Sequence, residues 1–293
     1  MTHRLILIEG IPGSGKTTLS ARLAEWLQAR GIQATLYREG DSHPADMAWN
    51  AVLSQAEYEQ VKKDHPQLQE ALASLTRVED DHCIVAYTKL GYDAMGPELN
   101  NFFAAHEVYD GRVPYALFAQ LHQNHWDAFA REALANPDRV YIFECAYLQN
   151  HVNELMAFHN KATAEILAHL TALAEPVMPL NPLLVYLEQA NPEETVRRVA
   201  AERVSAPGSG YPDWIDLVVG YVENSPHGKS MGYRGKDGAL RFFHDRIRLE
   251  QALWPDLPMD RIIIRNTSYD WDAQFEAMKA AVCGAAEASV LNR

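Results

Sequence analysis

The segment LILIEGIPGSGKTT, residues 5–18, decides the fold that the sequence predicts. It opens with the apolar run Leu5-Ile6-Leu7-Ile8, which predicts a strand over residues 5–9 that stops at a glycine-rich turn. Apolar side chains then recur at helical spacing over residues 17–30. A buried strand, a tight turn and an amphipathic helix in this order are typical of an α/β fold. We therefore expect the strand to lie inside a sheet that helices cover.

The turn in this segment has the composition of a phosphate-binding loop. Residues 10–17, GIPGSGKT, match the pattern G-x-x-x-x-G-K-[ST] between a predicted strand and a predicted helix, which is the context that a P-loop requires. Backbone N–H groups and the positive end of the helix favour phosphate oxygens there. We expect Lys16 to contact the β- and γ-phosphates of ATP and Thr17 to bind Mg²⁺. The residues expected to hold the nucleotide are Gly10, Gly13, Ser14, Gly15, Lys16, Thr17 and Thr18.

Further short runs of aliphatic and β-branched residues predict the other strands. They lie at residues 34–38, 140–144, 183–187 and 261–265. Helical periodicity occupies residues 115–134, 153–173, 193–203 and 273–283. Continuous apolar strands that alternate with amphipathic helices predict a parallel sheet covered on both faces. The expected fold class is α/β: a three-layer P-loop NTPase fold with a five-stranded parallel sheet and large helical insertions.

One domain is expected over residues 1–293, because no stretch has the composition of a clean linker. Roughly 100 residues separate the second and third predicted strands, far more than the dozen or so that a crossover needs. A helical insertion is therefore expected at about 42–138. A lid or loop insertion is expected at about 195–255, and within it the glycine-rich residues 227–238 are expected to form a surface loop.

The charge and the composition restrict the class of protein. The chain has 26 basic and 39 acidic residues, a formal net charge of -13 that repels nucleic acid and mildly favours a cationic small substrate. No apolar run approaches the roughly 20 residues of a membrane-spanning helix, so no membrane partner is expected. Three scattered cysteines, Cys83, Cys145 and Cys283, fit a reducing compartment. We expect a cytoplasmic protein whose oligomeric state is open, a homodimer included.

Segments in chain order resemble the nucleoside and nucleotide kinases with a thymidylate-kinase-like P-loop fold. They are residues 5–18, Tyr37-Arg38-Glu39-Gly40-Asp41, Phe143-Glu144-Cys145, residues 184–203 and the strand at 262–264. The resemblance covers the sheet framework and implies transfer of a phosphoryl group from ATP to a nucleoside or nucleotide. Cys145 stands where many members of this family have arginine after the acidic residue, and this departure leaves the acceptor subgroup unidentified.

Carboxylates at two predicted strand ends form the expected acceptor site. Glu39 and Asp41 follow the second strand, where open α/β sheets bind ligands, and either could bind or deprotonate an acceptor hydroxyl. Glu144 closes the third strand and could act as the base or hold Mg²⁺ together with Thr17. Arginines after the fourth strand suit phosphate oxygens, and at least one should reach the transferring group. The residues expected at the catalytic centre are Lys16, Glu39, Asp41, Glu144, Arg197, Arg198 and Arg203.

The expected function is that of an ATP-dependent kinase with a nucleoside triphosphate donor and a small-molecule acceptor, the first guess being a nucleoside or nucleotide. An antibiotic or another metabolite as the acceptor stays open. A switch or assembly ATPase that only hydrolyses its nucleotide also stays open. The guanine-reading pattern Asn-Lys-x-Asp is missing, since Asn160-Lys161 is followed by Ala162 and Thr163.

Overall fold

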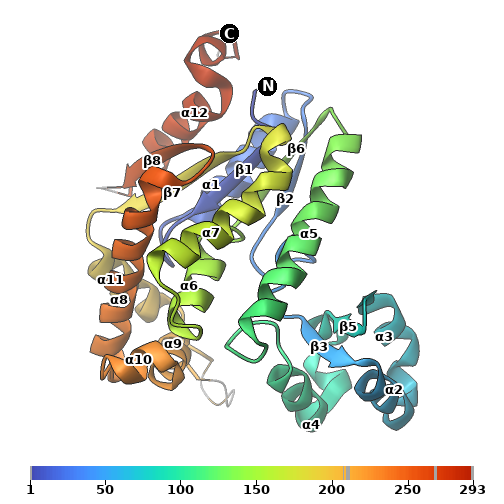
Figure 1. The fold of residues 1–293 in the computed structure, drawn as a ribbon. Helices are drawn as coiled ribbons and strands as arrows, with labels where there is room; N and C mark the ends of the chain where they lie inside the picture. Colours follow the sequence, from blue (N-terminus) through green and yellow to red (C-terminus); the bar gives the residue numbers. More distant parts are fainter. Residues whose placement is uncertain (1, 207, 209–211, 267–268, 292–293) are drawn as a thin grey trace. The chain divides into compact units, whose positions relative to one another are not determined.

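The computed structural model describes residues 2–206, 208, 212–266 and 269–291, with side chains up to residue 283. The chain divides into two compact units, and each is described by itself (Figure 1). The large unit comprises residues 1–45 and 123–293, and the small unit comprises residues 46–122. The expectation of one domain differs from this division, because the segment after the second strand buries an apolar core of its own.

The large unit is built on a parallel sheet. Its strands are β1 (Leu5–Glu9), β2 (Gln33–Tyr37), β6 (Arg139–Glu144), β7 (Leu183–Gln189) and β8 (Asp260–Asn266). They pair in the order β2-β6-β1-β7-β8, and every pair is parallel. The prediction of a five-stranded parallel sheet is confirmed for the described residues. β1 lies at the centre because its four apolar residues are fully buried, as a strand covered on both faces requires.

Helices cover both faces of this sheet, as predicted (Figure 1). They are α1 (Lys16–Gln28), α5 (Tyr115–Ala135, of which residues from 123 belong to this unit), α6 (Gln149–Ala157), α7 (Thr163–Ala174), α8 (Pro192–Glu202), α9 (Trp214–Asn224), α10 (Pro226–Ser230), α11 (Gly235–Leu253) and α12 (Trp271–Leu291), with 3-10 turns η3 (Glu175–Leu180) and η4 (Trp254–Asp256). Ile6 and Ile8 share a buried core with Leu23 of α1 and Met278 of α12 on one face. Side chains alternate along a strand, so Phe143 meets the ring of Phe129 of α5 on the other face. In the described part of the chain, no helix is both long and apolar enough to cross a membrane.

Two expectations about the second half of the large unit were wrong. The helix predicted at 153–173 is interrupted at residues 158–162, where Asn160 has a left-handed φ of 45°, so α6 and α7 are separate helices. Residues 227–238, expected to form a surface loop, are mostly helical, because α10 and the start of α11 cover them. Gly228 of α10 packs so closely that an added Cβ would lie 1.9 Å from the carbonyl oxygen of Val222. The glycines there serve helix packing as well as turns.

The small unit contains strands as well as helices, whereas a helical insertion was predicted. Its antiparallel strands are β3 (Ala51–Ser54), β4 (Thr76–Glu79) and β5 (His82–Val85), paired in the order β3-β5-β4. Its helices are α2 (Gln55–Asp64), η1 (Pro66–Leu68), α3 (Gln69–Leu75), η2 (Tyr87–Leu90) and α4 (Tyr92–Ala105). Leu53, Leu72, Val85 and Phe103 lie in its core. Strands of four residues carry too little periodicity to be separated from helix in the sequence.

Candidate active site

A cavity of about 400 Å³ lies at the carboxyl end of the parallel sheet. Residues of the glycine-rich loop after β1, Glu39 after β2 and Glu144 at the end of β6 line it. Gln149 at the start of α6 and residues at the end of α8 complete the wall, together with two tryptophans. After β1 the next strand of this sheet is β2, which lies at one edge, and after β7 it is β8, which lies at the opposite edge. The connections therefore run in opposite directions on the two sides of the sheet's centre. Ligands bind at such a switch point of an open α/β sheet.

The glycine-rich loop curls tightly between β1 and α1. Gly13 and Gly15 have left-handed φ values of 81° and 94°, and Gly15 caps the first turn of α1. An added Cβ on Gly15 would lie 2.1 Å from the ring of Trp271, so glycine is also required by space. Lys16 Nζ donates to the carbonyl oxygens of Gly10 at 2.9 Å and Ile11 at 3.0 Å. The ammonium group thus lies against the loop, and Lys16 as a whole is buried.

The residues predicted to hold the nucleotide divide into two groups. Gly13, Gly15, Lys16, Thr17 and Thr18 line the cavity. Gly10 and Ser14 lie behind the cavity wall, and an added Cβ on Gly10 would lie 2.8 Å from Ser14 Oγ. Ser14 is fully buried, and its Oγ has no hydrogen-bond partner among the described residues.

Glu144 contacts α1, the helix that follows the glycine-rich loop, through two hydroxyl groups. The Thr17 hydroxyl donates to Glu144 Oε1 at 2.5 Å, and the Ser20 hydroxyl donates to Oε2 at 3.4 Å. Glu144 is buried, and burial raises its pKa above the usual value, although the bond from Thr17 and the charge of Lys16 partly offset this effect. The two oxygen donors Thr17 and Glu144, expected to share a metal ion, are therefore adjacent.

Of the two carboxylates predicted after β2, the structure brings one to the cavity. Glu39 lines it, and the thiol of Cys145 donates to Glu39 Oε2 at 3.8 Å. Asp41 is exposed and closes the local turn, since its Oδ2 accepts a hydrogen bond from the backbone N–H of Arg38 at 2.8 Å. Asp41, four residues beyond the end of β2, thus forms a turn, as Asp side chains often do in loops.

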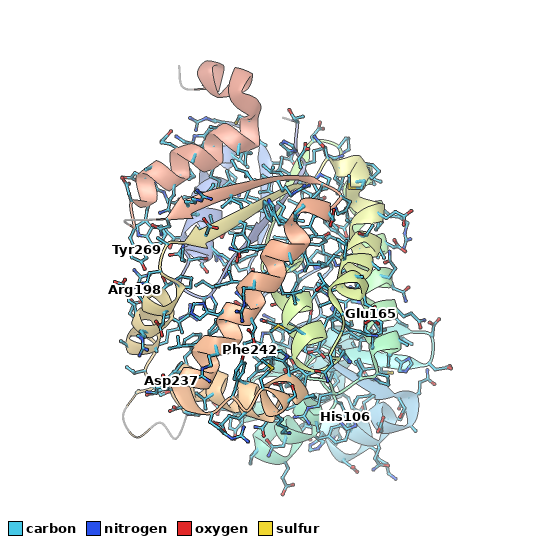
Figure 2. The ribbon with its side chains drawn as sticks, turned by 60° about the vertical axis from the view of Figure 1, so that its left-hand side comes forward. His106, Glu165, Arg198, Asp237, Phe242 and Tyr269 are labelled. Carbon is cyan, nitrogen blue, oxygen red and sulfur yellow. The ribbon has the colours of Figure 1, made fainter. Side chains whose placement is uncertain are left out.

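Two of the three predicted arginines line the cavity. Arg198 donates to the carbonyl oxygen of Gly13 at 3.3 Å, and its guanidinium carbon lies 3.8 Å from the ring centre of Tyr269. Figure 2 shows these two side chains beside each other. Arg203 also lines the cavity, with its guanidinium group 5.6 Å from the ring of Trp214. Arg197 is exposed and pairs with Glu193 at 3.2 Å, one turn away on the same helix.

Sequence reasoning missed Glu9 and Gln149. The carboxylate of Glu9 is fully buried and accepts hydrogen bonds from the backbone N–H groups of Tyr147 and Leu148 at 2.8 and 3.0 Å and of Gln149 at 2.9 Å. Burial raises the pKa of Glu9 to about 7, against the lowering effect of these bonds. The sequence signal for Glu9 is the same as for Glu144, a carboxylate at the end of an apolar strand. Nothing in the sequence distinguishes Gln149.

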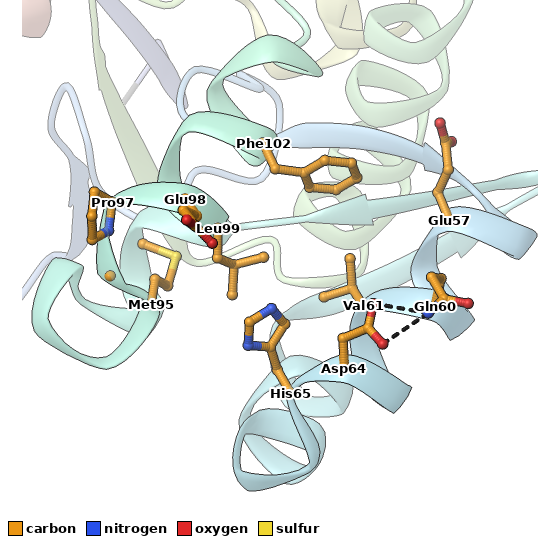
Figure 3. A pocket seen from close by; sticks show the side chains of 11 residues that line it. Glu57, Gln60, Val61, Asp64, His65, Met95, Pro97, Glu98, Leu99 and Phe102 are labelled. Atoms are coloured by element: carbon orange, nitrogen blue, oxygen red, sulfur yellow. Dashed lines mark hydrogen bonds between the residues drawn. The ribbon is translucent and has the colours of Figure 1, made fainter.

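The small unit has a groove of its own, about 620 Å³ in volume, shown in Figure 3. Val61 and Leu99 lie on its apolar side. Two of its carboxylates have partners within the small unit: Asp64 accepts from Gln60 at 2.8 Å, and Glu57 closes the start of α2 through Ser54. Among the described residues, no group of three or more His, Cys, Asp or Glu side chains could hold a metal ion. The large-unit cavity is therefore the stronger candidate.

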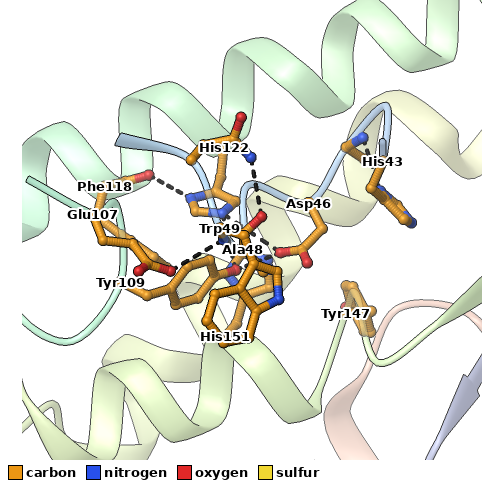
Figure 4. A network of polar contacts seen from close by, with 12 residues as sticks. His43, Asp46, Ala48, Trp49, Glu107, Tyr109, Phe118, His122, Tyr147 and His151 are labelled. Carbon is orange, nitrogen blue, oxygen red and sulfur yellow. Dashed lines mark hydrogen bonds and ion pairs between the residues drawn. The ribbon is translucent and has the colours of Figure 1, made fainter. Parts of the chain in front are cut away.

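Residues of the small unit also form a buried polar network, and Asp46, Glu107, Tyr109 and His122 of this network are among the residues labelled in Figure 4. Tyr109 donates a hydrogen bond to Asp46 at 2.6 Å, and its hydroxyl lies 3.0 Å from His122 Nε2. Glu107 accepts from the Tyr87 hydroxyl at 2.9 Å and from the backbone N–H of Trp49 at 3.1 Å. Burial raises the pKa of Glu107 to about 7. Mutual hydrogen bonding of buried groups favours a structural role for this network.

No protein-family model matches the chain, and no curated protein matches it.

Proposed function

We propose that this protein is an ATP-dependent P-loop kinase that transfers a phosphoryl group to a small molecule. One observation carries the proposal: the glycine-rich loop, Lys16, Thr17 and the carboxylate of Glu144 meet in a single cavity at the carboxyl end of the sheet. A phosphate-binding loop needs glycines, a lysine and a hydroxyl in this arrangement. A carboxylate beside the hydroxyl completes the set that phosphoryl transfer requires.

The donor half of the site would be formed by the loop and α8. Lys16 would exchange the carbonyl oxygens of Gly10 and Ile11 for the β- and γ-phosphate oxygens. Arg198 and Arg203 would add positive charge where negative charge develops during transfer. The ring of Trp271 borders the cavity next to Gly15 and offers a flat surface on which a nucleobase can stack.

The oxygen donors Thr17 and Glu144 fit Mg²⁺. This ion prefers hard oxygen ligands, takes one or two from the protein and completes its coordination with water and phosphate. When bound, it would neutralise charge on the β- and γ-phosphates. The 2.5 Å bond between the Thr17 hydroxyl and Glu144 Oε1 places both donors at one point of the cavity wall.

The acceptor half would lie on the side of β2 and β6. In an in-line transfer the acceptor oxygen forms a new bond to the γ-phosphorus, the bond from that phosphorus to ADP breaks, and the hydroxyl proton passes to a carboxylate. Glu39 and Glu144 are the carboxylates of the cavity on this side. The raised pKa of Glu144 suits proton uptake nearer to neutral pH.

The test is transfer of the γ-phosphate of labelled ATP, with Mg²⁺, to pooled nucleosides, nucleotides and aminoglycosides. We expect label in a small molecule, and we expect Lys16→Ala to reduce the rate about 10²–10³-fold, the usual cost of losing one electrostatic contact in a transfer site. Label that passes only to water, while a protein partner co-purifies, would identify a hydrolysing switch instead. A fully active and folded Lys16→Ala variant would remove the loop from the reaction.

A further inference from the structure

Gln149 is a buried amide at the edge of the candidate site. Its side chain is 6% exposed and lines the cavity together with Glu39 and Glu144. Its Oε1 is buried without a hydrogen-bond partner in the described part of the protein. Buried amides are nearly always hydrogen-bonded, because leaving one unpaired loses the hydration that water would supply. Gln274 of α12 has an unpartnered Oε1 as well, but of these two residues Gln149 is the one that lines the cavity, where a ligand can supply a partner for its amide.

Backbone hydrogen bonds and the conformation of the preceding turn fix the position of Gln149. Glu9 at the end of β1 accepts the backbone N–H of Gln149 at 2.9 Å and fixes the preceding residues by further bonds. The turn that leads to it begins at Cys145, a non-glycine residue with a left-handed φ of 67°. Backbone strain of this kind persists only where the surroundings determine it, and it is common near functional sites. The turn brings the side chain of Gln149 to the same cavity as Glu144.

The cations of the cavity all lie on one of its two sides, where Glu202 of α8 also lines the wall and pairs with Arg198 at 3.7 Å. Among the described lining residues, the cations are Lys16 on the loop and Arg198 and Arg203 at the end of α8. Lys16 and Arg198 both donate to carbonyl oxygens of the loop, so they belong to its side. The side reached from β2 and β6 presents Glu39, Glu144 and the neutral amide of Gln149. A phosphate group bound there would face carboxylates, and like charges repel.

We propose that Gln149 orients the phosphoryl acceptor, and that this acceptor is a hydroxyl compound without a phosphate group, its amine, where it has one, directed to Glu39. The inference rests on the proposed kinase function and restricts its acceptors to hydroxyl compounds without a phosphate group. The amide of Gln149 hydrogen-bonds a polar group of the acceptor and holds its hydroxyl toward the γ-phosphate. Transfer then joins that oxygen to the γ-phosphorus, releases ADP and leaves the proton on a carboxylate. Nucleoside monophosphates are thereby disfavoured relative to nucleosides, aminoglycosides and amino alcohols.

The first experiment compares matched acceptor pairs. Each nucleoside, aminoglycoside or amino alcohol is supplied beside its own monophosphate ester, with Mg²⁺ and labelled ATP. We expect kcat/KM for the phosphate-free member to be at least tenfold higher in every pair that reacts. A preference for the phosphate esters overturns the inference and leaves the kinase function standing. Transfer to no acceptor at all overturns both.

The second experiment compares Gln149→Leu with Gln274→Leu. Gln274 is an ideal match, because it is 5% exposed and its Oε1 has no hydrogen-bond partner in the described structure, yet it lies on α12 outside the cavity lining. We expect Gln149→Leu to raise KM for the acceptor at least tenfold and to keep the Kd of ATP within twofold. Gln274→Leu should leave both constants within twofold. An unchanged acceptor KM in folded Gln149→Leu removes Gln149 from the site.

If Gln149→Leu does not fold, Gln149→Glu decides the matter, because it keeps the shape of the side chain and adds a negative charge. We expect the ratio of kcat/KM for an aminated acceptor to that for its hydroxyl analogue to rise at least threefold. Glu39→Gln should lower the same ratio. A residue with only a structural role would change both acceptors equally, and equal changes in both variants would overturn the assignment.

Discussion

Glu144 connects α1 to the side of the cavity formed by β2 and β6, since it accepts the Thr17 hydroxyl at 2.5 Å and lines the cavity together with Glu39. Glu144→Gln keeps the shape and one acceptor oxygen but loses the charge needed for a metal ion or a proton. We expect kcat to fall about 10²–10⁴-fold, as for loss of an acid–base group, with a smaller change in KM for ATP. Steady-state kinetics check this. Glu193→Gln is the control, because Glu193 pairs with exposed Arg197 outside the cavity, and it should stay within twofold.

The reverse pattern, a raised KM for ATP with kcat preserved, would assign Glu144 to nucleotide binding alone.

Gly15 shows how space and backbone conformation combine at one residue. Its φ is 94°, and a Cβ would lie 2.1 Å from the ring of Trp271. Gly31 has a similar φ of 77° but no atom within 4 Å of an added Cβ, counting the described residues. We expect Gly31→Ala to cost about 1–2 kcal/mol of unfolding free energy, the usual cost of a left-handed alanine. Gly15→Ala should cost more, and it should weaken ATP binding, which Gly31→Ala should not.

Urea denaturation and nucleotide titration measure the two effects. Equal stability losses in both variants would mean that Trp271 moves away freely and that space does not matter at Gly15.

At the scale of elements, the strands were the most predictable part of the fold. β1 was predicted at its observed bounds, and β2, β6, β7 and β8 differ by no more than two residues at either end. A strand buried on both faces must be continuously apolar, so its pattern is readable without neighbours. The loop and Glu144 followed from these strands, because the carboxyl ends of parallel strands meet at one edge.

The elements that failed depend on contacts that a sequence does not display. The break between α6 and α7 turns on the left-handed Asn160, which periodicity cannot separate from a continuous helix. Asp41 and Arg197 follow strands whose ends form the cavity, but neither side chain lines it. Asp41 closes a local turn, and Arg197 pairs with the neighbouring Glu193. Gln149 enters the cavity wall through Glu9, a residue 140 positions away in the chain. Such long-range positioning has no local pattern.

The start of α6 depends on Glu9, and this gives a test of the element. The two oxygens of Glu9 accept three backbone N–H groups, those of residues 147–149. Glu9→Gln replaces one carboxylate oxygen by an NH₂ group. This NH₂ group would face a backbone N–H group that it cannot accept from. We expect a loss of about 1–3 kcal/mol in unfolding free energy, the cost of an unsatisfied buried group. Glu188→Gln, which removes a surface pair with Arg265 at 2.7 Å, should cost no more than about 1 kcal/mol.

Urea denaturation of the two variants at neutral pH decides between these values. Equal losses would mean that the amide rotates or water enters, and that α6 begins where it does without Glu9.

At the scale of the whole molecule, acidic groups dominate the electrostatics. The formal net charge is -13, and burial raises the pKa of both Glu9 in the large unit and Glu107 in the small unit to about 7. Between an ordinary value near 4.5 and about 7, the folded protein therefore binds more protons at these groups than the unfolded chain does. Stability must then fall as pH rises through this window, because proton binding favours the folded state.

Glu107 makes this dependence testable within the small unit. We expect the unfolding free energy of the natural protein in urea to decrease from pH 5 to pH 7, and Glu107→Gln to reduce that decrease because residue 107 no longer titrates. Glu57→Gln is the matched control. The Ser54 hydroxyl and backbone lower the pKa of Glu57, so its contribution is lost only as pH falls below the ordinary carboxyl range, outside this window. If Glu57→Gln alters the pH dependence and Glu107→Gln does not, the protons bound by the folded protein between pH 5 and pH 7 are not on Glu107. A slope that Glu107→Gln flattens would show that the hydrogen bonds from Tyr87 and Trp49 hold a carboxyl group that is partly protonated near neutral pH.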